Sequence, residues 1–416
     1  MLPAIIEAAP DSHMLRPAIE VALALLALCG LAFYAIALVS ARHFLRTLKR
    51  KPTSSVSPPM SILKPLKGAD SETYAALRSH CVQDYAQYEI LFGVNDEHDD
   101  AIPIVQSLIA DFPHLDLRLI VCSEVFGANR KVSNLIHLLR QARYEHLLVN
   151  DGDIKVARGY LREIASSFSN SEVGMITCLY RGESAATLGS RLEALGIATD
   201  FIPGVLTANY LEGGLRFALG STLAMTRTAL ERIGGFAAVV DYLADDYQLG
   251  ERISAAGFKV VLAREVVETS VPPYSFSQFW QHQVRWARTM RVSRPLGYLG
   301  LALTFGLPWA IFLALVNPQS SRTWLFLVGL LLTRIAVALT TGRKVLGDPQ
   351  IIGDLWLLPL RDLLGLAVWF WSFAGDKVSW SGERFRLEDG KMIPMQRSGQ
   401  PAKSVGVEEA SQPQRR

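Results

Sequence analysis

An uninterrupted apolar run near the N-terminus restricts the folds that are open to this chain. Residues 17–40 read PAIEVALALLALCGLAFYAIALVS, which is long enough to cross the hydrocarbon core of a bilayer. A cleavable signal peptide has a shorter apolar region behind a basic leader, whereas this leader carries Glu7 and Asp11. The basic residues follow the run instead, as Arg42, Arg46, Lys49, Arg50 and Lys51. The positive-inside rule therefore predicts an uncleaved anchor with the next domain in the cytoplasm.

The composition fits a soluble domain joined to membrane segments. Half of the residues are hydrophobic and the mean hydropathy is +0.21, while 19% are charged. The net charge of +3 indicates no particular partner. The four cysteines lack metal-ligand and CxxC spacing, so we expect buried free thiols in a reducing compartment.

Between residues 60 and 271, short apolar runs alternate with amphipathic helical patterns. The strand candidates are MSILKPL, YEILFGVN, LRLIV, HLLVN, VGMITC and KVVLA. Helical patterns such as AIPIVQSLIADF and KVSNLIHLLRQAR lie between most of them. This alternation predicts an α/β fold with a mainly parallel sheet covered by helices.

Beyond residue 295 the chain becomes apolar again, in runs at 296–316, 323–340 and 355–373. The last run contains Arg361 and Asp362, which are costly in lipid, so it is either re-entrant or interfacial, or the pair faces protein. The expected parts are a leader (1–16), an anchor (17–40), a basic and Pro/Ser linker (41–59), a catalytic domain (60–295), C-terminal membrane helices (296–373), and an interfacial segment with a disordered tail (374–416).

Acidic residues follow two of the predicted strands. In open parallel sheets, ligands bind beyond the carboxyl ends of the strands. There the chain places Asp96 and, after the strand at 146–150, the sequence Asp151-Gly152-Asp153. Two carboxylates around a tight turn suit a hard divalent cation, which keeps coordination positions free for phosphate oxygens. An isolated Asp-x-Asp sequence can also form a solvated acidic turn. Here the motif follows a buried strand, and this position favours cation binding.

Two further segments carry residues suited to group transfer. Asp245 and Asp246 precede a helical pattern; they can cap the helix, and Asp246 can also accept a proton from an attacking hydroxyl. In FWQHQVRWARTMRVSRP, Arg285 can pair with a diphosphate and Trp286 can stack or pack. The outer arginines of this segment suit either anionic head groups or an anchoring amphipathic helix; they are Arg288, Arg291 and Arg294.

Two polar, basic strings stand at the ends of predicted elements. One is KPLKG, which begins with Lys64, and the other is NRKVSN, which contains Lys131. Both can offer cations or backbone donors to a nucleotide, although either can be ordinary surface charge.

The ordered set of motifs resembles the ceramide glucosyltransferase family within the GT-A glycosyltransferases. That family combines a strand ending in LKPLKG, three separated aspartates and a (Q/R)xxRW motif. Here these are residues 62–68, then Asp96, Asp151 and Asp246, then 282–286. The resemblance covers residues 60–295 and extends loosely to VSWSGERFRL, at 378–387. His282 departs from it, because the family has Gln or Arg at that position.

The resemblance implies a role for each matching position. Asp96 would contact the uridine of a UDP-sugar, and Asp151, helped by Asp153, would bind a diphosphate with Mn²⁺ or Mg²⁺. Asp246 would be the catalytic base of an inverting displacement. Arg285 and Trp286 would complete the site. The donor side would also include Lys64, Lys131 and His282.

A second resemblance bears on the acceptor. Segments 127–135, 175–182, 243–251 and 294–298 are similar to bacterial hopanoid-associated glycosyltransferases. We therefore expect a protein of a bacterial inner membrane that transfers glucose or N-acetylglucosamine to a hydroxyl of a ceramide-like or hopanoid lipid, and that binds no nucleic acid. The alternatives are a processive polysaccharide synthase and an inactive sugar- or lipid-binding membrane protein. The sequence leaves the lipid, the sugar, the number of C-terminal spans and the oligomeric state open.

Overall fold

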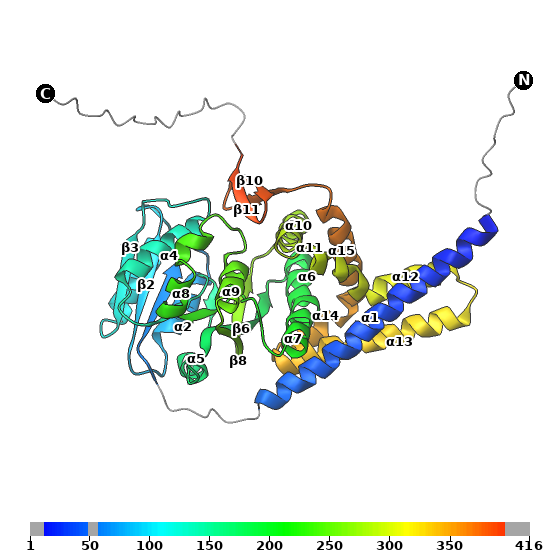
Figure 1. Ribbon diagram of the computed structural model, residues 1–416, viewed down its shortest axis with the longest axis horizontal. Helices are drawn as coiled ribbons and strands as arrows, with labels where there is room; N and C mark the ends of the chain where they lie inside the picture. Colours follow the sequence, from blue (N-terminus) through cyan, green and yellow to red (C-terminus); the bar gives the residue numbers. More distant parts are fainter. Residues whose placement is uncertain (1–11, 49–56, 396–416) are drawn as a thin grey trace, which may run out of the picture.

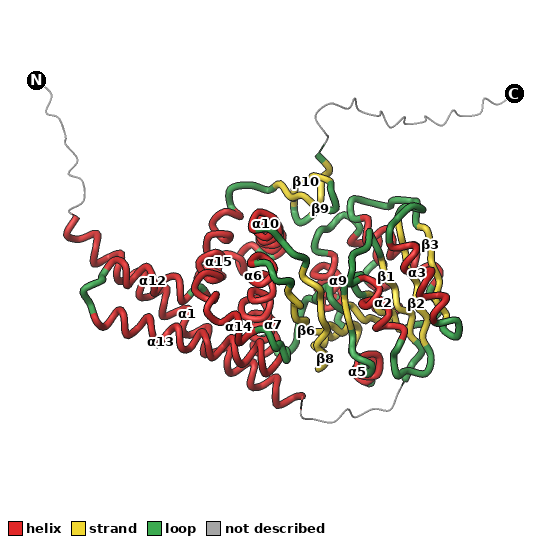
Figure 2. The backbone as a smooth tube through the Cα atoms, turned by 180° about the vertical axis from the view of Figure 1, so that it is seen from behind, coloured by secondary structure: helices red, strands yellow, loops and turns green. Residues whose placement is uncertain are grey.

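The computed structural model describes residues 12–48 and 57–395, and it shows an α/β domain beside a group of apolar helices (Figures 1 and 2). Much of the expected leader, part of the expected linker and the expected disordered tail lie outside the described residues. Helix α1 (Ser12–Leu48) contains the whole expected anchor and extends past it at both ends. The first part of the segment expected to be a linker is therefore helical.

The α/β domain is built on a mainly parallel sheet with strand order β3-β2-β1-β4-β7-β6-β8-β5. The strands are β1 (Met60–Pro65), β2 (Tyr88–Val94), β3 (Asp116–Val121), β4 (His146–Val149), β5 (Ile154–Lys155), β6 (Val173–Ser184), β7 (Leu223–Thr226) and β8 (Lys259–Val271). Strands β1 to β4 are parallel, as are β6 and β8. The short β7 runs antiparallel between β4 and β6, and β5 runs antiparallel to β8. The predicted fold class is confirmed, and each predicted strand is present.

Helices pack on this sheet, and apolar side chains fill the space between the layers. They are α2 (Thr73–Cys81), α3 (Ala101–Asp111), α4 (Arg130–Gln141), α5 (Tyr160–Ser167), α8 (Arg227–Arg232), the 3₁₀ turn η2 (Phe236–Val239) and α9 (Asp245–Ala255). Helix α4 begins where the side chain of Asn129 accepts a hydrogen bond from the backbone N–H of Val132, 3.1 Å away. This cap fixes the start of the NRKVSN string at the carboxyl edge of the sheet.

Two of the described helices are long and apolar enough to cross a membrane, Leu15–Leu48 and Ser321–Val345. The second joins α13 (Ser321–Ala338) to the π-helical turn η4 (Leu339–Val345). A third span is possible if a pair bent by 50°, Pro295–Thr304 and Gly306–Val316, counts as one. This pair comprises α11 (Pro295–Gly300), η3 (Leu301–Thr304) and α12 (Gly306–Val316).

Helices α1 and α12 cross with their backbones in close contact. A Cβ atom on Gly30 of α1 would lie 2.2 Å from the Cα atom of Gly306. Next to this crossing, the backbone N–H of Leu307 donates to the hydroxyl of Tyr34. The two glycines therefore allow the N-terminal anchor to pack against the C-terminal helices (Figure 1).

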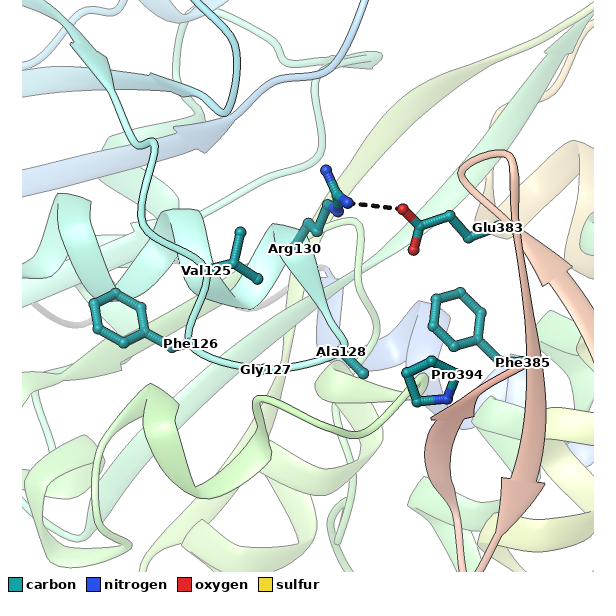
Figure 3. Close-up of a pocket in the computed structure, with 8 residues that line it drawn as sticks. All are labelled: Val125, Phe126, Gly127, Ala128, Arg130, Glu383, Phe385 and Pro394. Atoms are coloured by element: carbon teal, nitrogen blue, oxygen red, sulfur yellow. Dashed lines mark hydrogen bonds and ion pairs between the residues drawn. The ribbon is translucent and has the colours of Figure 1, made fainter. Parts of the chain in front are cut away.

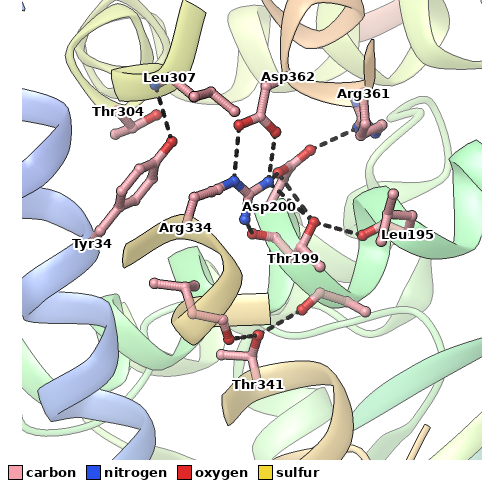
Figure 4. Close-up of polar contacts among 12 residues, drawn as sticks. Tyr34, Leu195, Thr199, Asp200, Thr304, Leu307, Arg334, Thr341, Arg361 and Asp362 are labelled. Carbon is pink, nitrogen blue, oxygen red and sulfur yellow. Dashed lines mark hydrogen bonds and ion pairs between the residues drawn. The ribbon is translucent and has the colours of Figure 1, made fainter. Parts of the chain in front are cut away.

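The last apolar run forms the short helices α14 (Ile351–Asp354) and η5 (Leu355–Leu357), followed by α15 (Leu358–Ser372). Arg361 and Asp362 of α15 are 7% and 4% exposed, so the pair faces protein. Their partners come from α13 and from a helical stretch after β6 (Figure 4). That stretch consists of α6 (Leu188–Gly196), the π-helical turn η1 (Ile197–Phe201) and α7 (Ile202–Leu211).

A three-stranded antiparallel sheet stands where the sequence suggested an interfacial segment. It contains β9 (Lys377–Trp380), β10 (Glu383–Glu388) and β11 (Lys391–Pro394). Its apolar side chains, such as Phe385 and Met392, pack around Leu243. The backbone N–H of Met392 donates to the carbonyl of Asp241 at 2.8 Å. The C-terminal sheet therefore covers the segment that leads into Asp245 and Asp246.

Candidate active site

Buried polar groups support the Asp-x-Asp turn from below. Lys64, at the end of β1, is fully buried and donates from Nζ to the carbonyl of Asp151 at 2.8 Å. Burial lowers the pKa of Lys64 to about 7, although the charges of Asp153 and Asp151 act in the opposite direction. Asn150 is also buried, and its Nδ2 donates to the carbonyl of Ser221 at 2.7 Å. These buried contacts therefore fix the turn, and Lys64 lies on its buried side rather than on its solvent-facing side.

The two carboxylates of the turn point to different partners. Asp153 accepts a hydrogen bond from the hydroxyl of Thr269 on β8 at 2.5 Å. Burial raises the pKa of Asp153, and the charge of Asp151 raises it further. The side chain of Asp151 is 41% exposed and lies 2.8 Å from Nζ of Lys131. Asp151 is thus the more accessible of the two.

Lys131, at the start of α4, connects this turn with α9. Its Nζ also lies 3.3 Å from Oδ2 of Asp245, which is buried. Burial lowers the pKa of Lys131, but the charges of Asp151 and Asp245 outweigh this effect and raise it above its ordinary value. A cation from the NRKVSN string is therefore placed between two of the acidic groups.

Asp246 and Asp151 converge on Gly220. A Cβ atom on Gly220 would lie 3.1 Å from Oδ2 of Asp246 and 3.6 Å from Oδ2 of Asp151. Burial raises the pKa of Asp246 to about 6, and the charge of Asp245 adds to the increase. Asp246 is therefore ionised at neutral pH and protonated in mild acid, next to the Asp-x-Asp turn.

The RW motif lies on α10 (Phe276–Ser293), which begins with a capping box between Ser275 and Gln278. Arg285 is half-buried, and its guanidinium makes no hydrogen bond or ion pair with any described residue. Burial lowers the pKa of Arg285, although the nearby Glu193 opposes this. The ring of Trp286 packs against the ring of Phe201, and their centres are 6.2 Å apart. Arg285 is therefore a cation available to a ligand.

Tyr180 on β6 links α10 with the acidic groups. Its ring lies 5.8 Å from that of Phe201, which in turn contacts Trp286. Burial raises the pKa of Tyr180, and the charges of Asp246 and Glu193 raise it further. Tyr180 thus connects to Trp286 on α10 through the ring of Phe201, and the charges of Asp246 and Glu193 act on its hydroxyl group.

His282 contacts Glu193 of α6 rather than any of the aspartates predicted for the site. Its Nδ1 lies 3.1 Å from Oε1 of Glu193, and its ring packs 5.2 Å from that of Trp286. The expected outer arginines also have protein partners. Arg288 donates to the carbonyl of Lys377, and Arg291 to those of Ser372 and Gly375. Arg294 remains half-exposed, 3.9 Å from Glu212.

Asp96 stands apart from this group. Its side chain is exposed. Among the described residues, only the backbone N–H of His98 donates to its carboxylate, at 2.9 Å from Oδ1. Its position after β2 is on the same edge of the sheet as Asp151, because β2 and β4 flank β1 in parallel. The structure thus places Asp96 at the edge where it was expected, without a contact to the other site residues.

A pocket of about 350 Å³ opens between the loop before α4 and the C-terminal sheet (Figure 3). Arg130 and Glu383 form an ion pair of 2.7 Å across it. Its lining residues are Val125, Phe126, Gly127, Ala128, Arg130, Glu383, Phe385 and Pro394. Lys67 donates to the carbonyl of Ser381 at 2.8 Å. The turn between β9 and β10, together with the first residue of β10, therefore contacts both basic strings predicted from the sequence.

The described residues contain no group of three or more His, Cys, Asp or Glu side chains arranged to hold a metal ion. A hard cation that binds together with a diphosphate needs only one or two carboxylates, since phosphate oxygens and water complete its shell. The accessible Asp151, with Asp153 behind it, fits that smaller requirement.

Sequence reasoning missed three residues of this site. Gly220 and Glu193 belong to no motif, and Tyr180 lies in segment 175–182 without having been assigned a role; each becomes significant only through its neighbours in space. Glu193 carried the one available signal, an acidic residue inside the apolar helical pattern LEALGIAT.

The curled, mainly parallel sheet and the acids at its carboxyl edge define a GT-A glycosyltransferase. A mannosyltransferase from Pyrobaculum calidifontis, solved in complex with GDP-Man and Mn²⁺, shares this fold. The match has a TM-score of 0.50 and 19% identity, and it covers 86% of this chain and 99% of the mannosyltransferase chain. The sequence model of glycosyl transferase family 21 matches residues 22–393, and the chain therefore belongs to this family.

Ceramide glucosyltransferases are among the proteins related to this chain in sequence. Ceramide glucosyltransferase 1 of Caenorhabditis elegans is 23% identical over 354 residues, which cover 82% of this chain and 74% of the relative. Ceramide glucosyltransferase 3 of the same organism is 27% identical over 241 residues, covering 58% of this chain and 52% of the relative. The protein is thus a glycosyltransferase of family 21 that carries helices long and apolar enough to cross a membrane.

Proposed function

We propose that this protein transfers a hexose from a UDP-sugar to the hydroxyl group of a ceramide-like lipid. The observation that carries the proposal is the convergence of Asp246 and Asp151 on Gly220. A carboxylate that can take a proton thereby lies beside one that can bind a diphosphate. The names of the relatives support ceramide as the acceptor and glucose as the sugar.

The donor would bind along the carboxyl edge of the sheet. Asp96 is assigned to the uridine, and the cations of Lys131 and Arg285 to the diphosphate. Asp151, with Asp153, would hold Mn²⁺ or Mg²⁺, which when bound offsets the charge of the departing UDP. The support for Arg285 is that its guanidinium has no partner among the described residues.

Asp246 is assigned as the catalytic base. At neutral pH its carboxylate accepts the proton of the lipid hydroxyl, whose oxygen attacks the anomeric carbon. The bond from that carbon to the UDP oxygen breaks in the same step, so the configuration inverts. Holding donor and hydroxyl side by side supplies much of the rate gain.

The acceptor would approach from the membrane helices, since α10 packs against α15 and leads directly into α11. The basic residues after the expected anchor support a catalytic domain on the cytoplasmic face. A reporter fused to the C-terminus tests this orientation, because the anchor followed by two full C-terminal spans, the bent pair and Ser321–Val345, puts both the catalytic domain and the C-terminus in the cytoplasm. A reporter active only outside would contradict an arrangement with two C-terminal spans.

The full chain, purified in detergent, tests the reaction. We expect UDP release from UDP-glucose when ceramide and Mn²⁺ are present, and its loss in Asp246→Asn. Equal release by wild type and Asp246→Asn would refute the assigned base. A reaction with hopanoid polyols or UDP-N-acetylglucosamine, but not with ceramide and UDP-glucose, would overturn the proposed substrates. Mass spectrometry of lipids from cells with and without the gene identifies the product.

A further inference from the structure

Glu193 of α6 binds two consecutive residues of the helix that carries the RW motif. Its side chain is 3% exposed. Oε1 lies 3.1 Å from Nδ1 of His282, and Oε2 accepts from Nε2 of Gln283 at 2.7 Å. A buried carboxylate is costly unless hydrogen-bonded, so this bidentate contact fixes α10 relative to α6. Arg285 and Trp286 follow within the next helical turn.

The same contact continues into the membrane helices. The Oε1 atom of Gln283 accepts from Nη2 of Arg361 at 3.0 Å, and Nη2 also lies 3.1 Å from Asp200. Asp200 pairs with Arg334 of α13, whose Nη2 lies 2.7 Å from Oδ1 of Asp362 (Figure 4). A continuous chain of polar contacts thus runs from a candidate membrane span to the active-site helix.

A π-helical turn supplies the junction of this chain. Turns of this kind leave backbone carbonyls without their usual helical partners, and they are frequent at functional sites. In η1 the carbonyl of Thr199 accepts from Nη1 of Arg334 at 2.7 Å. The carbonyl of Ala198 accepts from the hydroxyl of Thr341 at 2.9 Å. The carbonyls of η1 are therefore bound to α13 and η4, and Asp200 is held where it meets Arg361.

The contacts of Arg285 itself do not fix its position, because its guanidinium has no partner in the described part of the chain. The contacts of neighbouring residues fix its position instead. His282 packs on Trp286, and both His282 and Gln283 contact the carboxylate of Glu193. Arg285 is thus a free cation on a helix held by Glu193.

We propose that Glu193 is a positioning residue for glycosyl transfer, which holds His282 and Gln283 so that Arg285 is directed at the donor diphosphate. Arg361 and Asp200 extend this support to the membrane helix α13. The inference rests on the proposed role of Arg285 and is independent of the acceptor lipid.

A double-mutant cycle on the full chain tests the proposal, with UDP and Mn²⁺ as the probe and calorimetry as the readout. Glu193→Gln is expected to weaken UDP binding about tenfold, which corresponds to about 1.4 kcal/mol. Glu193→Gln combined with Arg285→Ala should bind UDP no more weakly than Arg285→Ala alone, because Glu193 acts through Arg285. Additive losses would overturn the proposal.

Glu89→Gln is the matched control. Glu89 is also buried, and it binds Ser61 and Arg143 at the opposite edge of the sheet. Its substitution should combine additively with Arg285→Ala. If Glu193→Gln does not fold, Gln283→Ala breaks the same contact from α10 and should give the same non-additive result. Wild-type UDP affinity in Arg285→Ala would refute the assignment of Arg285, and the positioning proposal with it.

Discussion

The ammonium group of Lys131 lies 2.8 Å from the carboxylate of Asp151, the residue assigned to the diphosphate and its cation. It also lies 3.3 Å from Asp245, which is buried. One cation at the start of α4 therefore offsets two acidic groups from separate elements. This arrangement keeps the acids together in the free enzyme and leaves a cation in place for the donor.

Replacement of Lys131 by Met is expected to lower the free energy of unfolding by about 3 kcal/mol, because it removes the cation that pairs with the buried Asp245. Chaotrope titration of the protein in detergent measures this loss. Lys131→Met combined with Asp245→Asn should recover most of the stability, since no unpaired charge remains, but not the affinity for UDP. Recovery of both would contradict a role for Lys131 at the donor.

The pH dependence of transfer should follow Asp246. Its pKa is raised to about 6, so the base is ionised above this pH and protonated below it. We therefore expect kcat/KM to fall about tenfold for each pH unit below the pKa and to level off above it. Initial rates of UDP release across the acidic range measure the profile.

The neighbouring Asp245 supplies the control for this profile. Its negative charge raises the pKa of Asp246, so Asp245→Asn should move the acidic limb to lower pH. A limb that stays in place, or moves to higher pH, would show that another group titrates.

Gly220 should tolerate no side chain. A Cβ atom added at Gly220 would lie 3.1 Å from the carboxylate of Asp246, which is closer than an ordinary van der Waals contact. Gly220→Ala is expected to lower kcat/KM about tenfold and Gly220→Val about hundredfold, because small displacements of reacting groups have effects of this size. Gly204→Ala is the matched control, since nothing lies within 4 Å of its added Cβ. Equal activity in both alanine variants would argue against a reacting centre at Gly220.

The elements that could be predicted from the sequence are those with strong local patterns. Strands such as β1 and β4 are short apolar runs buried in the sheet. The apolar residues and the turn residues that mark them lie within the same few positions of the sequence. The antiparallel β7 has four residues and pairs with β4 and β6, which are distant in the sequence, so its local pattern does not predict it. By contrast, β10 alternates charged with apolar residues and pairs with its sequence neighbours β9 and β11, so a local signal for it was present.

The candidate site shows the same division. Asp151 and Asp246 follow recognisable patterns, and the structure brings them to one place. Arg361 and Asp362 could not be interpreted from α15 alone, because their partners Arg334 and Asp200 lie on other helices. Charge in an apolar run has an ambiguous meaning until its partners are known.

The crossing of α1 and α12 offers a test of the membrane region. Gly30→Leu places a side chain where even a Cβ atom would lie 2.2 Å from the backbone of Gly306. Because that contact is backbone, rotation of a side chain cannot relieve it, and we expect a loss of stability of about 3 kcal/mol. Thermal unfolding of the detergent-solubilised protein measures the loss. Gly329→Leu on α13 is the matched control, because nothing lies within 4 Å of its added Cβ. If α1 were a simple tether with no fixed packing, both leucine variants would unfold at the wild-type temperature.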